Sequence, residues 1–288
     1  MLAIFALVAA VVAITVVIHS SGGLSSSAPE GNQPSGAVIQ GASGPETGDS
    51  SSLPSKLVRN ATTQPDWQPS TAPVPILAYH ELGAPIPDAP YPELFTTRPD
   101  FRDEMNWLDD HGYEAVTLDQ VEQAWYEHGR LPPKPVVISF DDGYRPQFTY
   151  ALPELRRHGW AGVLDLKAEG SDLYTSNVES MIAAGWELAS HTINHLDLTT
   201  LSDAEMRHEL AGSRAILRHD YGVPVNNFCY PSGQFDARVE AAVKAAGYTA
   251  ATTEVQGFAS REDPYALDRF EVLGSSGVPG VASFMRSG

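Results

Sequence analysis

The chain has 288 residues and a formal net charge of −18, from 36 acidic and 18 basic side chains. This excess of acid excludes nucleic acid and anionic membrane surfaces as favoured partners and suits a neutral or cationic substrate. The single cysteine, Cys229, excludes an internal disulfide, and the length allows one large domain or two small ones.

The first 18 residues are apolar except for Thr15. As a helix they would be about 27 Å long, close to the roughly 30 Å of a bilayer core. No Lys or Arg precedes this segment and no clear Ala-x-Ala site follows it, so both a cleaved signal peptide and an uncleaved membrane anchor are compatible with it. We expect residues 1–19 to direct export, leaving the protein either anchored and facing outside, which we favour, or secreted.

Residues 20–73 are rich in Ser, Gly, Pro, Thr and Ala and contain few large apolar side chains. Such a segment buries too little surface to offset the entropy lost on ordering it. The composition therefore predicts a flexible linker over residues 20–73, followed by a catalytic domain over residues 74–288.

From Val74 onward, short apolar runs alternate with amphipathic stretches, which predicts strands alternating with helices. The strands are expected at residues 74–80, 114–118, 136–140, 161–166, 187–190, 227–230 and 249–253. The helical stretches stop at glycines, which accept the left-handed conformation beyond a last helical turn: Gly112, Gly129, Gly159, Gly185, Gly222 and Gly247. About seven such units predict an α/β fold, a distorted (β/α)7-type barrel.

Polar residues follow several of these strands. His80 ends the first, Asp141 and Asp142 follow a β-branched run, His191 follows the strand expected at residues 187–190, and Tyr230-Pro231-Ser232-Gly233 begins at the end of a later one. In such barrels catalytic residues lie at the C-terminal ends of the strands, so these side chains are expected to meet on one rim. This convergence predicts an enzyme.

Two motifs carry the chemistry, Ser-Phe-Asp-Asp-Gly-Tyr over residues 139–144 and Ser-His-Thr-Ile-Asn-His over residues 190–195. Two imidazoles and one carboxylate suit a divalent metal such as zinc and leave a coordination position open for water. The second carboxylate of the pair is then free to take a proton from that water.

These motifs resemble the first two motifs of the NodB-homology polysaccharide deacetylases, carbohydrate esterase family four, and the resemblance extends over about residues 74–284. It implies a distorted barrel that removes acetyl groups from N-acetylated sugars, or sometimes O-acetyl esters. It further implies that Asp142, His191 and His195 bind the metal, and that Asp141 is the general base acting on metal-bound water. Zinc is the default metal, with nickel or cobalt as alternatives.

The resemblance also implies an oxyanion-binding N–H near Tyr230, Pro231 and Ser232, while Tyr144 is one of several aromatic residues available to stack on a sugar. Two departures stand out. The third motif usually reads Arg-x-Pro-Tyr-Gly, but here it reads Cys-Tyr-Pro-Ser-Gly over residues 229–233, without the arginine that orients the base. The late Leu-x-His motif that supplies the acid is absent as well.

In place of that late motif, Pro-Ile-Leu-Ala-Tyr-His over residues 75–80 resembles the opening strand of the poly-N-acetylglucosamine deacetylases, in which an early histidine is the acid. His80 is therefore the expected acid, and an N-acetylated polysaccharide is the expected substrate. An O-acetyl esterase would be preferred if His80 lay outside the site, because an ester needs the acid less than an amide does. A carbohydrate-binding pseudoenzyme and a non-glycan amidase are further alternatives. The polymer, its linkage and the oligomeric state are not predicted.

Overall fold

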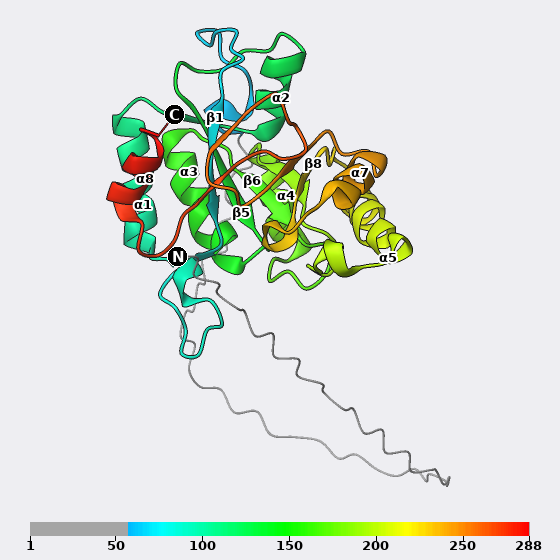
Figure 1. Ribbon diagram of the computed structural model, residues 1–288. Helices are drawn as coiled ribbons and strands as arrows, with labels where there is room; N and C mark the ends of the chain where they lie inside the picture. The colour runs from blue at the N-terminus through cyan, green and yellow to red at the C-terminus, as the bar shows by residue number, and fades with distance from the viewer. Residues whose placement is uncertain (1–56, 288) are drawn as a thin grey trace, which may run out of the picture. The chain divides into compact units, whose positions relative to one another are not determined.

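A nine-stranded sheet forms the centre of the computed structural model, which describes residues 57–287 (Figure 1). Its main path has the order β10-β1-β5-β6-β7-β8-β9, with β11 also paired to β1 and β4 paired to β5. Every pair is parallel except β10 against β1. The strands are β1 (Val74–Tyr79), β4 (Glu114–Val116), β5 (Pro135–Asp141), β6 (Val163–Leu166), β7 (Glu187–Ser190), β8 (Asn227–Cys229), β9 (Ala250–Thr252), β10 (Phe258–Ala259) and β11 (Phe270–Glu271).

The sheet curls into a ring that is closed by the segment of residues 264–272. Leu267 in this segment forms a parallel bridge with Thr252 of β9, and β11, a few residues later, pairs with β1. The prediction of a distorted (β/α)7-type barrel is therefore confirmed. Parallel pairing with helical crossovers is what the alternation of apolar runs and amphipathic stretches required.

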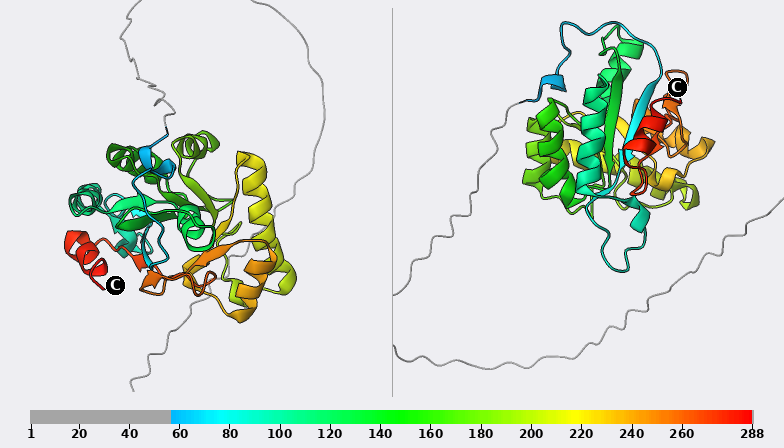
Figure 2. Two further views of the ribbon diagram at one scale, coloured as in Figure 1. Left: turned by 90° about the horizontal axis from the view of Figure 1, so that it is seen from above. Right: turned by 90° about the vertical axis from the view of Figure 1, so that its left-hand side faces the viewer.

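Helices surround the strands, as the view from above shows (Figure 2). The helices are α1 (Arg98–Asp110), α2 (Leu118–Tyr126), α3 (Leu152–His158), α4 (Thr175–Ala183), α5 (Asp203–Arg207), α6 (Ser213–Tyr221), α7 (Ala237–Ala245) and α8 (Gly277–Phe284). Thr117 and Gln120 form a capping box at the start of α2, which satisfies backbone groups that the helix itself leaves free. Gly159 and Gly222 end α3 and α6 in the left-handed conformation, as predicted.

Side chains alternate between the two faces of each strand, and this alternation positions the site. In β5, Ile138 and Phe140 belong to the large core that also takes in the helices, whereas Val137 belongs to a second cluster with Val163 and Ala189 from the next strands. The second cluster includes residues of most strands around the ring and marks the inner face of the barrel. Asp141, two positions beyond Ser139 and four beyond Val137, therefore points to the inner face.

The domain begins earlier than predicted. Residues 57–73, assigned above to the linker, pack against the barrel, and Trp67 among them is fully buried. Asn60 is also fully buried and donates a hydrogen bond of 3.0 Å to the backbone oxygen of Ala115. One buried tryptophan contributes as much apolar area as several smaller residues, which offsets the polar composition around it. The boundary predicted at Val74 therefore falls too late.

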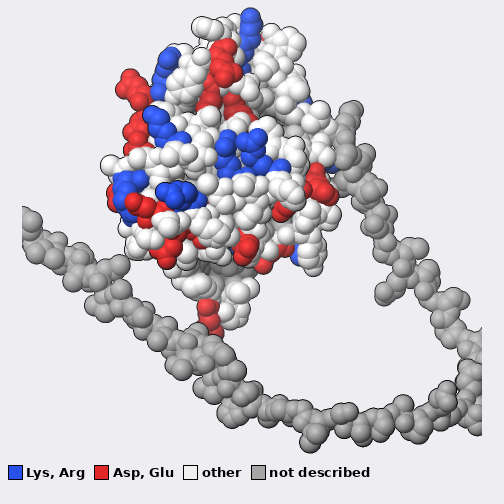
Figure 3. All heavy atoms as spheres, turned by 90° about the vertical axis from the view of Figure 1, so that its right-hand side faces the viewer, with Lys and Arg blue, Asp and Glu red and all other residues white. Residues whose placement is uncertain are grey.

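The predicted apolar segment, residues 1–19, and most of the predicted linker lie outside the described residues, so export and anchoring stay predictions. Among residues 57–287, none of the helices combines the length and apolar character needed for a membrane crossing. On the face in Figure 3, basic and acidic side chains of these residues lie in small, separate groups.

Candidate functional site

The predicted site residues meet at the C-terminal ends of the strands. His80 directly follows β1, Asp142 follows β5, and His191 follows β7. Together with His195, these three line a single cleft of about 730 Å³. Asp141, the last residue of β5, is only 1% exposed and lies beneath the cleft floor.

The backbone around the cleft is held in conformations that residues other than glycine rarely adopt. Asp142, His195 and Ser232 all have positive φ, of 73°, 58° and 51° respectively. Each such residue costs roughly 1–3 kcal/mol, and such strain persists where the surrounding structure enforces it. Glycine is favoured at position 143 in the same turn, because its φ is 78° and a Cβ there would lie 2.5 Å from the side chain of Leu166. The turn after β5 thus aims Asp142 at the cleft.

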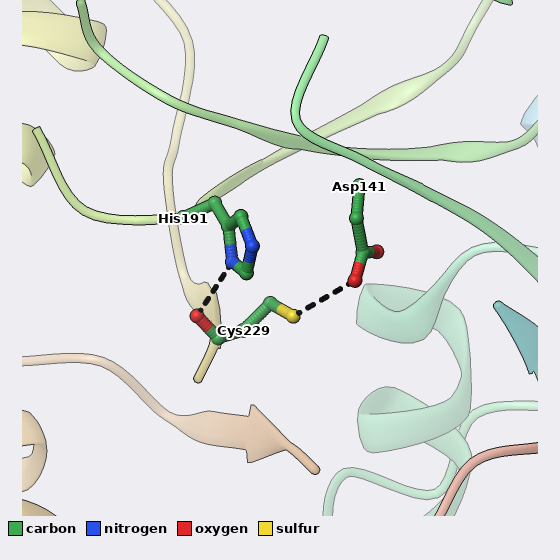
Figure 4. A group of neighbouring side chains, drawn as sticks. All are labelled: Asp141, His191 and Cys229. Atoms are coloured by element: carbon green, nitrogen blue, oxygen red, sulfur yellow. Dashed lines mark hydrogen bonds between the residues drawn. The ribbon is translucent and has the colours of Figure 1, made fainter. Parts of the chain in front are cut away.

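Asp142, His191 and His195 form one of two groups whose potential ligand atoms all lie within 4.8 Å of one another among the described residues. The Oδ1 atom of Asp142 lies 3.7 Å from Nε2 of His195. The Nδ1 atom of His191 lies 2.9 Å from the backbone oxygen of Cys229 and donates to it, so Nε2 keeps its lone pair (Figure 4).

The charge states of this group also fit a metal. Burial lowers the pKa of His191 to about 4, against the raising effect of Asp141 and Asp142, so the imidazole is neutral at pH 7. Burial alone would raise the pKa of Asp142, but His191, Lys167 and His195 outweigh it, and the pKa of Asp142 is lowered. One carboxylate and two imidazoles, of which that of His191 is neutral, are ligands typical of a divalent metal site with an open position.

Asp141 is paired with a buried arginine that the sequence analysis did not identify. Arg269 donates one hydrogen bond of 2.8 Å to Oδ1 of Asp141 and another of 2.9 Å to Oδ2. Burial by itself raises the pKa of Asp141, but the Arg269 charge and its hydrogen bonds outweigh burial and hold that pKa well below its usual range. Cys229 contributes a weak thiol donor, its Sγ lying 3.5 Å from Oδ2 (Figure 4).

Arg269 pairs with Asp141 although the third motif lacks its usual arginine. The guanidinium is fully buried and also donates from Nε to the backbone oxygen of Thr253 at 2.8 Å. The arginine comes from the segment that closes the ring rather than from β8. A single Arg between Asp268 and Phe270 carries no local signal of this role, because its position depends on how the barrel closes.

A second residue that the sequence analysis did not identify is the acid Asp165, which lies on β6 opposite Asp141 in the strand register. It lies 3.7 Å from Nη1 of Arg269, and its Oδ2 atom has no hydrogen-bond partner among the described residues. Burial, followed by the nearby Asp141 charge, raises the pKa of Asp165 well above its ordinary value. We therefore expect Asp165 to be protonated while Asp141 is ionised.

His80 lies on the cleft side of Asp141. Its Nε2 atom is 3.7 Å from Oδ2 of Asp141, and the residue is 7% exposed. Gln147 ties the two together by donating to the backbone oxygens of His80 at 3.0 Å and of Asp141 at 2.6 Å. Gln147 is thus a positioning residue that the sequence motifs did not reveal.

The four residues predicted to contact substrate do not all reach the cleft. Tyr144 and Ser232 line it, whereas Pro231 is buried. The side chain of Tyr230 is fully buried and donates to the backbone oxygen of Tyr265 at 2.9 Å, so this side chain does not face the cleft. The reason is strand alternation: Cys229 points to the inner face, and its neighbour therefore points away.

The predicted oxyanion-binding N–H can be narrowed to one residue. The backbone N–H of Tyr230 is bonded to the oxygen of Thr252 at 3.1 Å, and Pro231 has no N–H. Ser232 lines the cleft, and its N–H has no partner among the hydrogen bonds of residues 57–287. Ser232 is therefore the available donor of the three.

Comparison with known proteins agrees with this geometry. Residues 128–251 match the family model described as Polysaccharide deacetylase, a range that contains Asp141 and the three ligand candidates but neither His80 nor Arg269. The YxkH protein of Bacillus subtilis (strain 168), provisionally named a polysaccharide deacetylase, is 29% identical over 216 residues, covering 73% of this chain and 75% of that protein.

Two further relatives are informative. The poly-beta-1,6-N-acetyl-D-glucosamine N-deacetylase of Escherichia coli (strain K12) is 37% identical over 62 residues, which cover 22% of this chain and 9% of that protein. The solved structure of the Streptococcus pyogenes deacetylase PplD in complex with acetate superposes with a TM-score of 0.70 at 21% identity, covering 75% of this chain and 100% of that one. The second likeness concerns the fold alone.

Proposed function

We propose that this chain, whose residues 128–251 match the Polysaccharide deacetylase family model, hydrolyses N-acetyl groups on an N-acetylglucosamine-containing polysaccharide. The observation that carries the proposal is the placement of Asp142, His191 and His195 around one cleft, directly above the buried pair of Asp141 and Arg269. This arrangement suits hydrolysis of an acyl bond by an activated water.

Asp142, His191 and His195 would hold a divalent metal, with zinc as the first choice and nickel or cobalt as alternatives. A metal at this position would polarise the acetyl carbonyl and make water more acidic. The ligand side chains come from two turns fixed by positive-φ residues, so their geometry is set before any metal arrives.

Asp141 accepts the proton of the attacking water. Arg269 keeps the carboxylate ionised and fixes its plane through two hydrogen bonds. The same arginine makes Asp141 a weak base, because it lowers the pKa of the carboxyl group. Asp141 and the ligand candidate Asp142 are consecutive residues, which places the proposed base beside the metal position.

His80 donates a proton to the leaving amine. Its Nε2 atom lies 3.7 Å from Asp141, so a proton accepted by the carboxylate is one side-chain contact from the imidazole. An amide needs such an acid because an amine anion is a poor leaving group. The location of His80 in the cleft therefore favours an amide over an O-acetyl ester as substrate. The Ser232 N–H would support the oxyanion.

The cleft walls suit an amino sugar. Tyr91, Leu94 and Leu273 provide apolar surface for sugar rings, and the loop that carries Tyr91 is held at both ends by pairing of β2 (Glu81–Leu82) with β3 (Phe95–Thr96). Glu93, Glu254 and Glu271 add carboxylates that form no ion pair with Lys, Arg or His among the described residues. Deacetylation produces an ammonium group, which such carboxylates favour.

The test uses the full chain, stripped of metal and then titrated with zinc, with acetate release measured from N-acetylglucosamine oligomers of β-1,6 and β-1,4 linkage. Zinc-dependent release is expected, with the β-1,6 oligomer preferred because of the similarity to the Escherichia coli enzyme. The His195→Ala variant serves as the control for site-specific release. Zinc binding without acetate release from any oligomer would refute the proposed N-deacetylase.

A further inference from the structure

A lysine already faces the metal-ligand carboxylate. Lys167 directly follows β6, and its Nζ atom lies 3.4 Å from Oδ1 of Asp142. The side chain is only 18% exposed, lines the cleft, and places its ammonium 5.8 Å from the centre of the Tyr144 ring. Asp142 is the only ion-pair partner of Lys167 among residues 57–287. The carboxylate that would bind a metal thus also pairs with a cation of the protein itself.

The other charged groups near Asp142 do not compete with a metal for its carboxylate as Lys167 does. Arg269 is engaged with both oxygens of Asp141, and the two histidines are themselves ligand candidates. Glu81 lies close enough for the Asp142 charge to raise its pKa, after the larger effect of burial, and it adds negative charge to the surroundings. Lys167 is therefore the cation that a divalent ion would meet directly on reaching Asp142.

We propose that Lys167 is a built-in counter-ion of the metal site: it holds Asp142 in the metal-free protein and is displaced from it when a divalent metal binds. The inference rests on the proposed function, since it concerns the metal site of that reaction. Two consequences follow from the electrostatics. Lys167 stabilises the metal-free site against the repulsion of buried carboxylates, and it weakens metal binding because the incoming cation must separate an ion pair and remain near an ammonium.

The test is a zinc titration of the metal-stripped full chain against a chromophoric chelator. Replacing Lys167 by methionine keeps the length and apolar stem and removes the charge. We expect Lys167→Met to bind zinc about tenfold more tightly than the unmodified protein, equal to about 1.4 kcal/mol. Lys167→Arg should stay close to the original affinity. The matched control is Lys244→Met on the exposed face of α7, which should leave the affinity unchanged.

A second readout separates this role from a purely structural one. Without metal, Lys167→Met should unfold at a lower temperature than the unmodified protein, and zinc should raise its unfolding temperature by more. A structural role alone would lower the unfolding temperature equally with and without zinc. Unchanged or weaker zinc affinity in Lys167→Met would overturn the inference.

Failure of the proposed function gives a different pattern. If the unmodified protein binds zinc but releases no acetate, the proposed substrate is wrong, and the two dissociation constants still decide the role of Lys167. If the unmodified protein binds no divalent metal at all, the metal site is wrong and the inference falls with it.

Discussion

The pairing of Asp141 with Arg269 makes the most direct prediction about turnover. Both side chains are 1% exposed, and two hydrogen bonds of 2.8 and 2.9 Å join them. Replacing Arg269 by methionine removes both donors and leaves a buried carboxylate without its cation. Breaking a buried ion pair in this way costs about 3–5 kcal/mol of folding free energy. Arg269→Lys, which keeps the charge but cannot form the bidentate contact, should cost less.

The effect on catalysis follows from the pKa of Asp141. Burial raises this pKa and the Arg269 charge lowers it, so removing the arginine lets burial dominate. We expect the acid limb of the pH–rate profile to move to higher pH in Arg269→Met, because the base must be ionised to act. Turnover at pH 7 should fall by about 100-fold or more, comparable to loss of one preorganised charged group in an active site.

The assay is zinc-dependent acetate release from pH 5 to 9, combined with zinc titration and circular dichroism. Zinc affinity should change far less than turnover, because Arg269 contacts Asp141 rather than a ligand candidate. Arg269→Lys guards against an unfolded variant and should show an intermediate rate and an intermediate shift. A folded Arg269→Met protein with the original rate and pH profile would refute the role assigned to the arginine.

Three further predictions concern single residues. Asp141→Asn should keep zinc binding and lose turnover, whereas His195→Ala should lose both; acetate release near the original rate in Asp141→Asn would exclude that residue as the base. His80→Ala should slow amide cleavage at least tenfold more than cleavage of an activated acetyl ester, because only the amine needs a proton; equal losses on both substrates would argue against His80 as the acid. Burial raises the pKa of Glu122 to about 7. A carboxyl group whose pKa is higher in the folded protein than in the unfolded chain stabilises the folded state fully below about pH 4.5, and this contribution is lost as pH rises through 7. Glu122→Gln should remove that loss. Its free energy of unfolding in urea, compared with that of the unmodified protein, should be higher at pH 8 than at pH 4.5 by roughly 1–2 kcal/mol after allowance for solvent screening. An unchanged pH dependence would contradict the assignment.

The parts of the site that the sequence predicted are those held by local structure. The two motifs each occupy one strand end, so the pattern of strands along the chain was enough to place Asp142 and His191 on one rim. The same strand periodicity accounts for the orientation of Tyr230. Since Cys229 faces the inner side of β8, the alternation already required the tyrosine to face the helices, where it stacks on Phe235.

Long-range contacts explain what was not predicted. Arg269 and Asp141 are 128 positions apart, and they meet only because the final segment closes the ring between β9 and β1. Similarly, the burial of Trp67 depends on a surface that α2 and the loop before β5 create together, since Gln68 bridges to Leu131 and Trp67 clusters with Trp125. Neither arrangement follows from the composition of the segment concerned.

The altered third motif has a geometric explanation in the inner face of the barrel. Position 229 on β8 and position 269 on the closing segment both deliver a side chain to the layer around Asp141, because each points inward at nearly the same height. Arg269 reaches the carboxylate from the closing segment, and a second arginine at position 229 would add another buried cation to the same layer. A small thiol at position 229 leaves the volume that the Arg269 guanidinium fills. The proposed base, Asp141, therefore has one inward-pointing arginine in this layer, and the closing segment supplies it.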